Sequence, residues 1–126
     1  MKSKLLVWLL DLLYPPRCML CHRLIEAKSA PVCAKCMEAL PEHDGAERHV
    51  AGAAHCVVTF FYEGTLRDGF LRYKFEGRQW YARQFGAWLA VTVRDKLTGK
   101  FDLVTWVPVS RKRRRTRGYD QAELLC

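Results

Sequence analysis

The sequence predicts an α/β protein in which a small N-terminal zinc ribbon of four cysteines precedes a parallel-sheet unit. Three observations support this fold class: two neighbouring Cys-x2-Cys pairs, two apolar β-branched segments, and helical patterns between and after those segments. Hydrophobic residues make up 50% of the 126 positions, which is enough apolar material for a core and argues against a disordered chain. The length suits one domain, or a metal-stapled module joined to part of a larger one.

The excess of positive charge limits the kinds of partner that the chain is expected to bind. The net charge is +8, and Arg111–Arg117 alone carries six positive charges in seven residues. A basic chain favours phosphate-bearing partners, either nucleic acid or nucleotide-like metabolites. The charge does not choose between these two.

A short apolar segment, residues 4–14, opens the chain. It is interrupted by Asp11, lacks the small-residue cleavage site of a secretory signal, and is far shorter than the roughly 20 apolar residues that span a bilayer. We expect a short cytosolic helix that packs on the domain and ends at Pro15 and Pro16. The leucines on its apolar side are Leu5, Leu6, Leu9, Leu12 and Leu13. The predicted location is the cytoplasm, with no membrane span.

Two Cys-x2-Cys pairs, separated by eleven residues, are the strongest chemical signal. A two-residue spacing lets a tight turn direct two sulfurs to one point, and two such turns complete the tetrahedral shell of a structural Zn²⁺ site. The predicted ligands are Cys18, Cys21, Cys33 and Cys36. A closed shell of four thiolates leaves no position for water or substrate, so the predicted zinc is structural and we assign no catalytic residue.

Redox and disulfide roles are the alternatives for these cysteines. A redox Cys-x2-Cys normally occurs once beside a βαβ pattern, and disulfides require an oxidising compartment. His22 follows a predicted ligand but falls outside the paired spacing, so it is not counted as one. Cys56 is expected to be a buried small apolar residue, and no role is predicted for Cys126.

The remaining chain divides at a polar segment rich in Gly and Ala. Residues 38–54 are predicted to be a linker between an N-terminal helix and zinc ribbon at 1–37 and an α/β domain at 55–126. In the second domain, residues 56–64 and 101–109 are β-branched and apolar and are predicted to be strands. The second is nearly continuous, as in strands buried on both faces of a parallel sheet.

Two helices are predicted between these strands, at 65–77 and 78–99. In the first, Leu66, Phe70 and Tyr73 lie at helical spacing. The apolar side of the second consists of Tyr81, Phe85, Trp88, Leu89 and Val93. This order of elements is typical of an α/β unit.

The basic run Arg111–Arg117 is predicted to be a loop after the second strand, followed by a helical start at 119–126. Charge runs are usually solvated, and Arg113–Arg115 are interpreted in that way. An incomplete sheet would leave Val104 and Trp106 with unpaired backbone neighbours. We therefore expect marginal stability, self-association, or completion by another chain.

Two longer stretches, YEGTLRDGFLRYKFEGR at 62–78 and VPVSRKRRRTRGYDQAELL at 107–125, resemble the ComF family of competence-associated, phosphoribosyltransferase-like proteins. The family pattern in the second stretch is a Val-Pro strand end, a basic loop, and Arg-Gly-aromatic-Asn-Gln-Ala. The matching positions are Arg117, Gly118, Tyr119, Gln121 and Ala122. The chain departs from the pattern at Asp120, where Asn is more usual.

The resemblance implies a type I phosphoribosyltransferase fold behind a zinc-ribbon head and, for some members, a link to the uptake of transforming DNA. In that fold, two acidic residues followed by Thr-Thr-Gly bind phosphoribosyl pyrophosphate, with carboxylates on the ribose hydroxyls and backbone N–H groups on the 5′-phosphate. The sequence contains no such segment. We expect an incomplete domain without transferase activity of its own, either a short form or a fragment of an enzyme of nucleotide metabolism.

Two classes of function remain open. In a phosphoribosyltransferase-type enzyme or binder, basic residues would contact phosphoribosyl pyrophosphate or a similar ligand, and Gly118 would allow close backbone approach. In an interaction module, the zinc head and basic loop would bind single-stranded DNA or a DNA-uptake protein. The candidate binding residues are Lys74, Arg111, Lys112, Arg117, Gly118 and Gln121, of which Lys74 comes from the family pattern.

Overall fold

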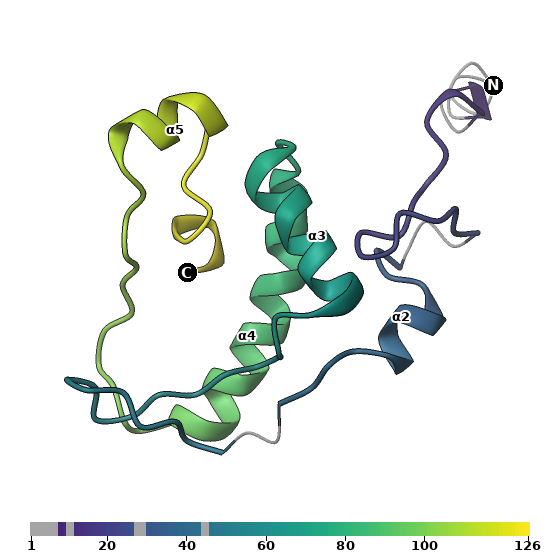
Figure 1. Ribbon diagram of the computed structural model, residues 1–126. Coiled ribbons are helices and arrows are strands. Elements are labelled where there is room, and N and C mark those ends of the chain that lie inside the picture. Colours follow the sequence, from purple (N-terminus) through teal and green to yellow (C-terminus); the bar gives the residue numbers. More distant parts are fainter. Residues whose placement is uncertain (1–7, 10–11, 27–29, 44–45) are drawn as a thin grey trace.

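The computed structural model describes residues 8–9, 12–26, 30–43 and 46–126, and its regular elements are helices and helical turns (Figure 1). In chain order they are α2 (Ala34–Glu38), α3 (Gly64–Phe75), the 3₁₀ turn η1 (Gln79–Tyr81), α4 (Ala82–Leu97), α5 (Arg111–Arg117) and the 3₁₀ turn η2 (Glu123–Leu125). The long helices α3 and α4 lie together at the centre of the molecule, with α2 on one side and α5 on the other.

The predicted parallel-sheet unit is wrong, and with it the phosphoribosyltransferase-like sheet that the resemblance implied. Within the described ranges the chain forms no strand, and its β-structure is limited to two isolated antiparallel bridges. One of them, Glu42 with Phe60, joins the predicted linker to the predicted strand 56–64. Residues 56–63 are therefore an irregular segment that pairs with the chain just before it rather than with a distant strand, and Gly64 begins α3.

Residues 101–109 form an extended segment that runs from the end of α4 to α5 (Figure 1). The side chains of Leu103 and Val107 are 80% and 86% exposed, so the segment is not buried on two faces as predicted. Its β-branched residues favour extended backbone, but a strand also requires a neighbouring strand for its hydrogen bonds. No described segment supplies one, and self-association of the chain stays a prediction.

The helices α3 and α4 confirm the two helices predicted in the middle of the chain. Leu66 and Tyr73 of α3 and Phe85 of α4 are buried in one cluster. A glycine with positive φ follows each helix, Gly77 at 68° and Gly99 at 75°. L side chains rarely adopt this conformation, so glycine there ends both helices.

The N-terminal leucines that the structure describes do not join the core. Leu9, Leu12 and Leu13 are 46%, 65% and 63% exposed, so the expected packing on the domain is not seen for them. Leu5 and Leu6 lie outside the described residues. Across the described ranges, no helix combines the length and the apolar character that crossing a bilayer requires.

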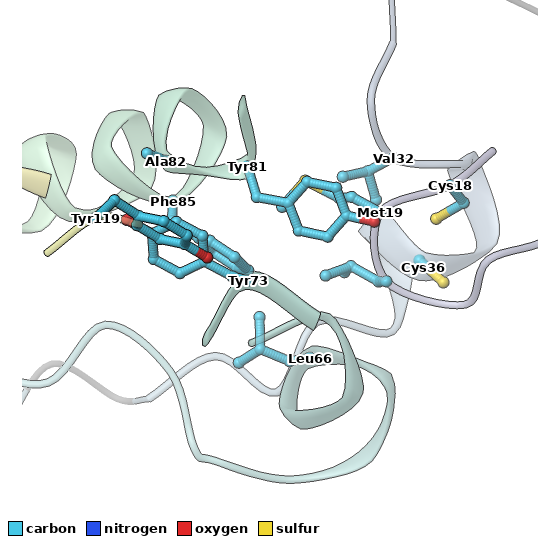
Figure 2. Packing of buried hydrophobic residues seen from close by; sticks show 11 residues of the cluster. Cys18, Met19, Val32, Cys36, Leu66, Tyr73, Tyr81, Ala82, Phe85 and Tyr119 are labelled. Atoms are coloured by element: carbon cyan, nitrogen blue, oxygen red, sulfur yellow. The ribbon is translucent and has the colours of Figure 1, made fainter. Parts of the chain in front are cut away.

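One core joins the cysteine head (residues 14–26 and 30–38) to the central helices (Figure 2). Met19 and Leu20, which lie between the first two cysteines, are fully buried in the same cluster as Tyr73 and Tyr81. Arg72 of α3 donates hydrogen bonds from Nη2 to the carbonyl oxygens of both head residues, at 3.4 Å for Met19. The head is therefore docked on α3 by apolar burial and by satisfied backbone carbonyls.

Gly69 permits this docking. A Cβ atom at Gly69 would lie 2.6 Å from Leu20 Cδ2 and 3.0 Å from the Met19 carbonyl oxygen. Glycine within a helix costs about 1 kcal/mol relative to alanine. Its presence in the middle of α3 is explained by the close approach of the head.

Aromatic rings hold the C-terminal segment against the same helices. Tyr119 lies with its ring centroid 5.8 Å from that of Tyr73, which in turn lies 5.7 Å from Phe85. The Tyr73 hydroxyl donates to the Gln121 carbonyl oxygen at 2.7 Å. These contacts place the chain after α5 on α3 and α4, and so position α5 beside the end of α3.

The Gly69→Ala variant is expected to be less stable than the parent by about 1–3 kcal/mol, because the added methyl meets a fully buried leucine and a backbone oxygen. The matched control is Gly86→Ala in α4, where the nearest atom to the new Cβ is 3.9 Å away. That control should gain about 0.5–1 kcal/mol from helix propensity. Urea unfolding of the zinc-loaded chains measures both, and equal stability of the two variants would contradict the proposed docking.

Candidate functional site

The first two cysteines lie in a tight hairpin. The Cys18 N–H donates to the Arg23 carbonyl at 2.8 Å, and the His22 N–H donates to the Cys18 carbonyl at 2.9 Å. His22 has a φ of 61°, in the left-handed region that sharp reversals use. The reversal directs the thiols of Cys18 and Cys21 toward one point, as their spacing predicted.

The second pair uses the start of a helix. Cys33 is the extended residue that precedes α2, and Cys36 lies inside that helix. The N–H groups of Cys36 and Met37 each donate to the Cys33 carbonyl at 3.0 Å. Three positions along a helix amount to slightly less than one turn, so the two thiols lie on the same side.

The four thiols form one cluster whose geometry suits zinc. Their Sγ atoms all lie within 4.8 Å of one another. The Cys21 and Cys33 sulfurs are 3.8 Å apart, which equals the edge of about 3.8 Å expected for a tetrahedron with Zn–S bonds of about 2.3 Å. This separation is far beyond the roughly 2.05 Å of a disulfide, and all six cysteines are free thiols. The residues present therefore fit a structural Zn²⁺ rather than disulfides.

The thiols differ in how easily they ionise. Burial opposes ionisation of Cys18, but backbone N–H donors, including that of Cys33 at 3.4 Å, outweigh it and lower its pKa to about 7. Burial raises the pKa of Cys36 to about 12, and the thiols of Cys21 and Cys33 add to this effect. A divalent cation stabilises all four thiolates together, so zinc binding releases protons.

The Cys36→Ser variant is expected to lose most bound zinc and to unfold at lower temperature, because the buried thiolate completes the shell. Zinc affinity of the parent should also fall as the pH is lowered, because protons compete with zinc for the thiolates, and the fall should steepen below about 7, where Cys18 becomes protonated as well. Metal analysis and thermal unfolding followed by circular dichroism measure these effects. The control is Cys56→Ser, which lies outside the cluster and should keep its zinc. Full zinc occupancy in Cys36→Ser would contradict the assignment.

A helix, α5, stands where a basic loop was predicted. Ser110 caps it by accepting a hydrogen bond at Oγ from the Arg113 N–H at 3.4 Å. Gly118, with a φ of 80°, ends it and donates from its N–H to the Arg114 carbonyl at 2.8 Å. Serine before and glycine after a run of good helix formers is a recognisable helix signature, which the concentration of like charge obscured.

Most of the predicted binding residues meet between α3 and α5. Lys74, Arg117 and Gln121 line a hollow of about 380 Å³ together with Arg113. An adjoining hollow of about 520 Å³ shares Lys74, Arg113 and Arg117 and adds Lys112. We call the two hollows together the α3–α5 cleft.

Two predicted residues do not line the cleft. Arg111 and Gly118 lie outside both hollows, and Gly118 has a different role as the helix cap. Arg113, which was predicted to be solvated, is exposed as predicted and also lines both hollows. Helical geometry explains this, because Arg113 and Arg117 are four positions apart and share a face of α5.

Aromatic rings, rather than carboxylates, hold the cations of the cleft. Lys74 Nζ lies 5.2 Å from the centroid of the Phe70 ring, and Arg117 Cζ lies 4.8 Å from that of Phe75. Arg117 also donates from Nη1 to Gln121 Oε1 at 2.7 Å. No acidic residue occurs among the described residues that line the cleft. Cation–π contacts leave the positive charge uncompensated, so the cleft favours anions.

Asp120, where the chain departs from the ComF pattern, is a buried anchor with 2% of its surface exposed. Its Oδ2 accepts from the Val109 N–H at 2.9 Å, and its Oδ1 accepts from the Ala122 N–H at 3.0 Å. These donors, that of Val109 foremost, lower its pKa although burial opposes the shift. Asp120 thereby ties the residues before α5 to the turn after it and fixes both ends of the cleft-forming helix.

Asp120→Asn is expected to lower the urea midpoint at neutral pH, because an amide has one acceptor oxygen where the carboxylate has two. The difference in urea midpoint between the parent and Asp120→Asn should narrow as the pH falls through the lowered pKa of Asp120. A carboxyl whose pKa is lowered by folding stabilises the fold only while it is ionised. Asp102→Asn, at an exposed position, serves as the control. A parent-like midpoint for Asp120→Asn at neutral pH would contradict the anchoring role.

Residues 9–48 match the double zinc ribbon domain. The match spans about a third of the chain and contains both cysteine pairs. No curated protein and no solved structure matches the chain. The chain thus contains a zinc-binding ribbon domain with four cysteines placed to hold one structural Zn²⁺, and no match assigns the rest of it to the ComF family or to a phosphoribosyltransferase-like domain.

Proposed function

We propose that the chain is a zinc-stabilised module that binds phosphate groups of single-stranded DNA in the α3–α5 cleft, as a ComF-like protein associated with DNA uptake. The observation that carries this proposal is the convergence of Lys74, Arg113 and Arg117 on one cleft that has no acidic residue among its described lining. Lysine and arginine contacts to phosphates release bound counterions, which is the main source of affinity in nonspecific binding.

Arg117 is held in place within the cleft before any ligand arrives. Arg117 is partly buried, lies against Phe75 and is held by Gln121, so its guanidinium has a defined direction. A fixed guanidinium presents paired N–H donors that match phosphate oxygens. Binding then costs less side-chain entropy than it would with freely moving surface cations.

A polymer suits this surface because charge and aromatic rings lie together. Tyr62 and Phe75 line the cleft and are 53% and 66% exposed, which gives bases a place to stack beside the cations. The exposed cations Arg111, Lys112 and Arg115 extend the positive charge along α5 beyond a single phosphate. These features favour a strand with several phosphates. A DNA-uptake protein carrying such a strand is a further partner within this proposal.

The second candidate is a binder of a small phosphorylated metabolite, such as phosphoribosyl pyrophosphate. The volumes of about 380 and 520 Å³ favour it, because small-molecule sites typically fall between about 300 and 1,000 Å³. We place the protein in the cytoplasm in either case. A reducing compartment supports this location, because it keeps the four clustered cysteines as thiols that can bind zinc rather than as disulfides.

The test is fluorescence anisotropy with a labelled oligo(dT) across a salt series. Lys74→Gln combined with Arg117→Gln should weaken binding by about 10-fold and should reduce the slope of log K against log salt by about 1.4, or about 0.7 for each lost phosphate contact. Arg94→Gln combined with Lys96→Gln removes the same charge near the far end of α4, outside the cleft, and is the matched control.

Equal affinity and equal salt slope in the two double variants would reject the cleft as the DNA site. Titration calorimetry with phosphoribosyl pyrophosphate separates the two candidates. The second candidate replaces the first if the parent binds phosphoribosyl pyrophosphate saturably, the cleft variant does not, and neither protein binds the oligonucleotide.

A further inference from the structure

A second hollow, of about 920 Å³, lies between the cysteine head and the start of α4. The head contributes Tyr14 and Arg17, while the α3–α4 connection and α4 contribute Arg78, Trp80 and Arg83. We call this hollow the head–α4 groove. No acidic residue occurs among its described lining residues, and neither sequence pattern nor family match points to it.

Trp80 is an exposed ring that packs edge to face against a buried one. The Trp80 side chain is 54% exposed, whereas Tyr81 is only 2% exposed. The two ring centroids are 4.3 Å apart in an edge-to-face arrangement. Tyr14 adds a second ring to the same groove and is 78% exposed. An indole that packs on a buried ring and remains open to solvent is a platform for stacking an aromatic ligand.

Three guanidinium groups accompany these rings. Arg17 donates from Nη1 to the His22 carbonyl at 3.2 Å, and among the described residues Arg78 and Arg83 have no carboxylate partner. The walls between them include Pro15, Pro16 and other apolar side chains. Low-dielectric walls strengthen the field of uncompensated cations, which favours an anionic ligand.

The combination selects one chemistry. A purely apolar ligand would leave three cations without partners, and a bare anion would leave the exposed indole unused. A planar base joined to a phosphate satisfies both, because stacking needs only a π-face and guanidinium matches phosphate.

We propose that the head–α4 groove binds a nucleotide unit, with its base stacked on Trp80 and its phosphate paired with Arg78 and Arg83. The unit is either a free nucleotide or part of a single strand. In the second case the inference rests on the function proposed above. Gly77 lines the α3–α5 cleft and Arg78 lines the groove, so both hollows border the α3–α4 connection.

The test measures binding to the zinc-loaded full chain of AMP, by titration calorimetry, and of a labelled oligo(dA) of about 12 nucleotides, by anisotropy. Trp80→Ala should weaken binding of the recognised probe by about 10-fold, and Trp80→Phe should retain most of the affinity because it keeps a ring. The matched control is Trp106→Ala, which removes an indole outside the groove and should bind like the parent. Saturable AMP binding identifies a free nucleotide, and binding of the oligonucleotide alone identifies a strand.

Arg83→Gln keeps the inference testable if Trp80→Ala folds poorly. Arg83 is exposed on α4, so its replacement leaves the core intact and should still weaken binding by several-fold. Zinc content and circular dichroism verify folding of each variant. Unchanged affinity for both probes in Arg83→Gln and Trp80→Ala, or an equal loss in Trp106→Ala, overturns the inference.

The two proposals fail separately. Lys74→Gln with Arg117→Gln alters the α3–α5 cleft alone, whereas Trp80→Ala alters the groove alone. If the cleft variant binds oligo(dA) like the parent while Trp80→Ala is weakened, the α3–α5 cleft fails as the DNA site and the groove stands. If the cleft variant is weakened while Trp80→Ala binds like the parent, the groove is rejected as a nucleotide site and the proposed function stands.

Discussion

The attraction of four thiolates to one divalent cation is the constraint on which the rest of the structure depends. It holds the first hairpin against the start of α2, and the residues between the first two cysteines, Met19 and Leu20, are thereby presented as one apolar surface. That surface is fully buried against α3, where Gly69 lets it approach and Arg72 satisfies its carbonyl oxygens. Zinc binding free energy therefore contributes to the stability of the central helices as well as to that of the head.

The α3–α5 cleft depends on a different set of contacts. Tyr119 packs on Tyr73, and Asp120 holds the backbone on both sides of α5. A short helix with so many like charges would be unstable alone, because it is shorter than the length at which isolated helices persist and its charges repel. Burial of the residues that flank it overcomes this repulsion, so the cations of α5 are held close together at a defined position beside Lys74.

Local signals could be predicted from the sequence, and non-local ones could not. The cysteine spacing and the helical periodicity of α3 and α4 depend on neighbours a few positions away, and the structure confirms the four-cysteine cluster and both helices. Segments 56–64 and 101–109 have the composition of strands, but a strand exists only when another segment pairs with it. The groove around Trp80 was not foreseen because its walls come from the head and from α4, which no local pattern links.

The two hollows consequently depend on zinc to different degrees. The α3–α5 cleft is lined by residues at or after position 62, so it requires the head only insofar as the head supports α3. The head–α4 groove takes one of its walls from Tyr14 and Arg17 of the head, and that wall has its position only while the first hairpin is folded. An ion that performs no chemistry therefore determines whether Arg17 and Trp80 face a common space. The structural metal therefore reaches the central helices through the docking of the head, and the close approach of Leu20 to Gly69 is the physical link between them.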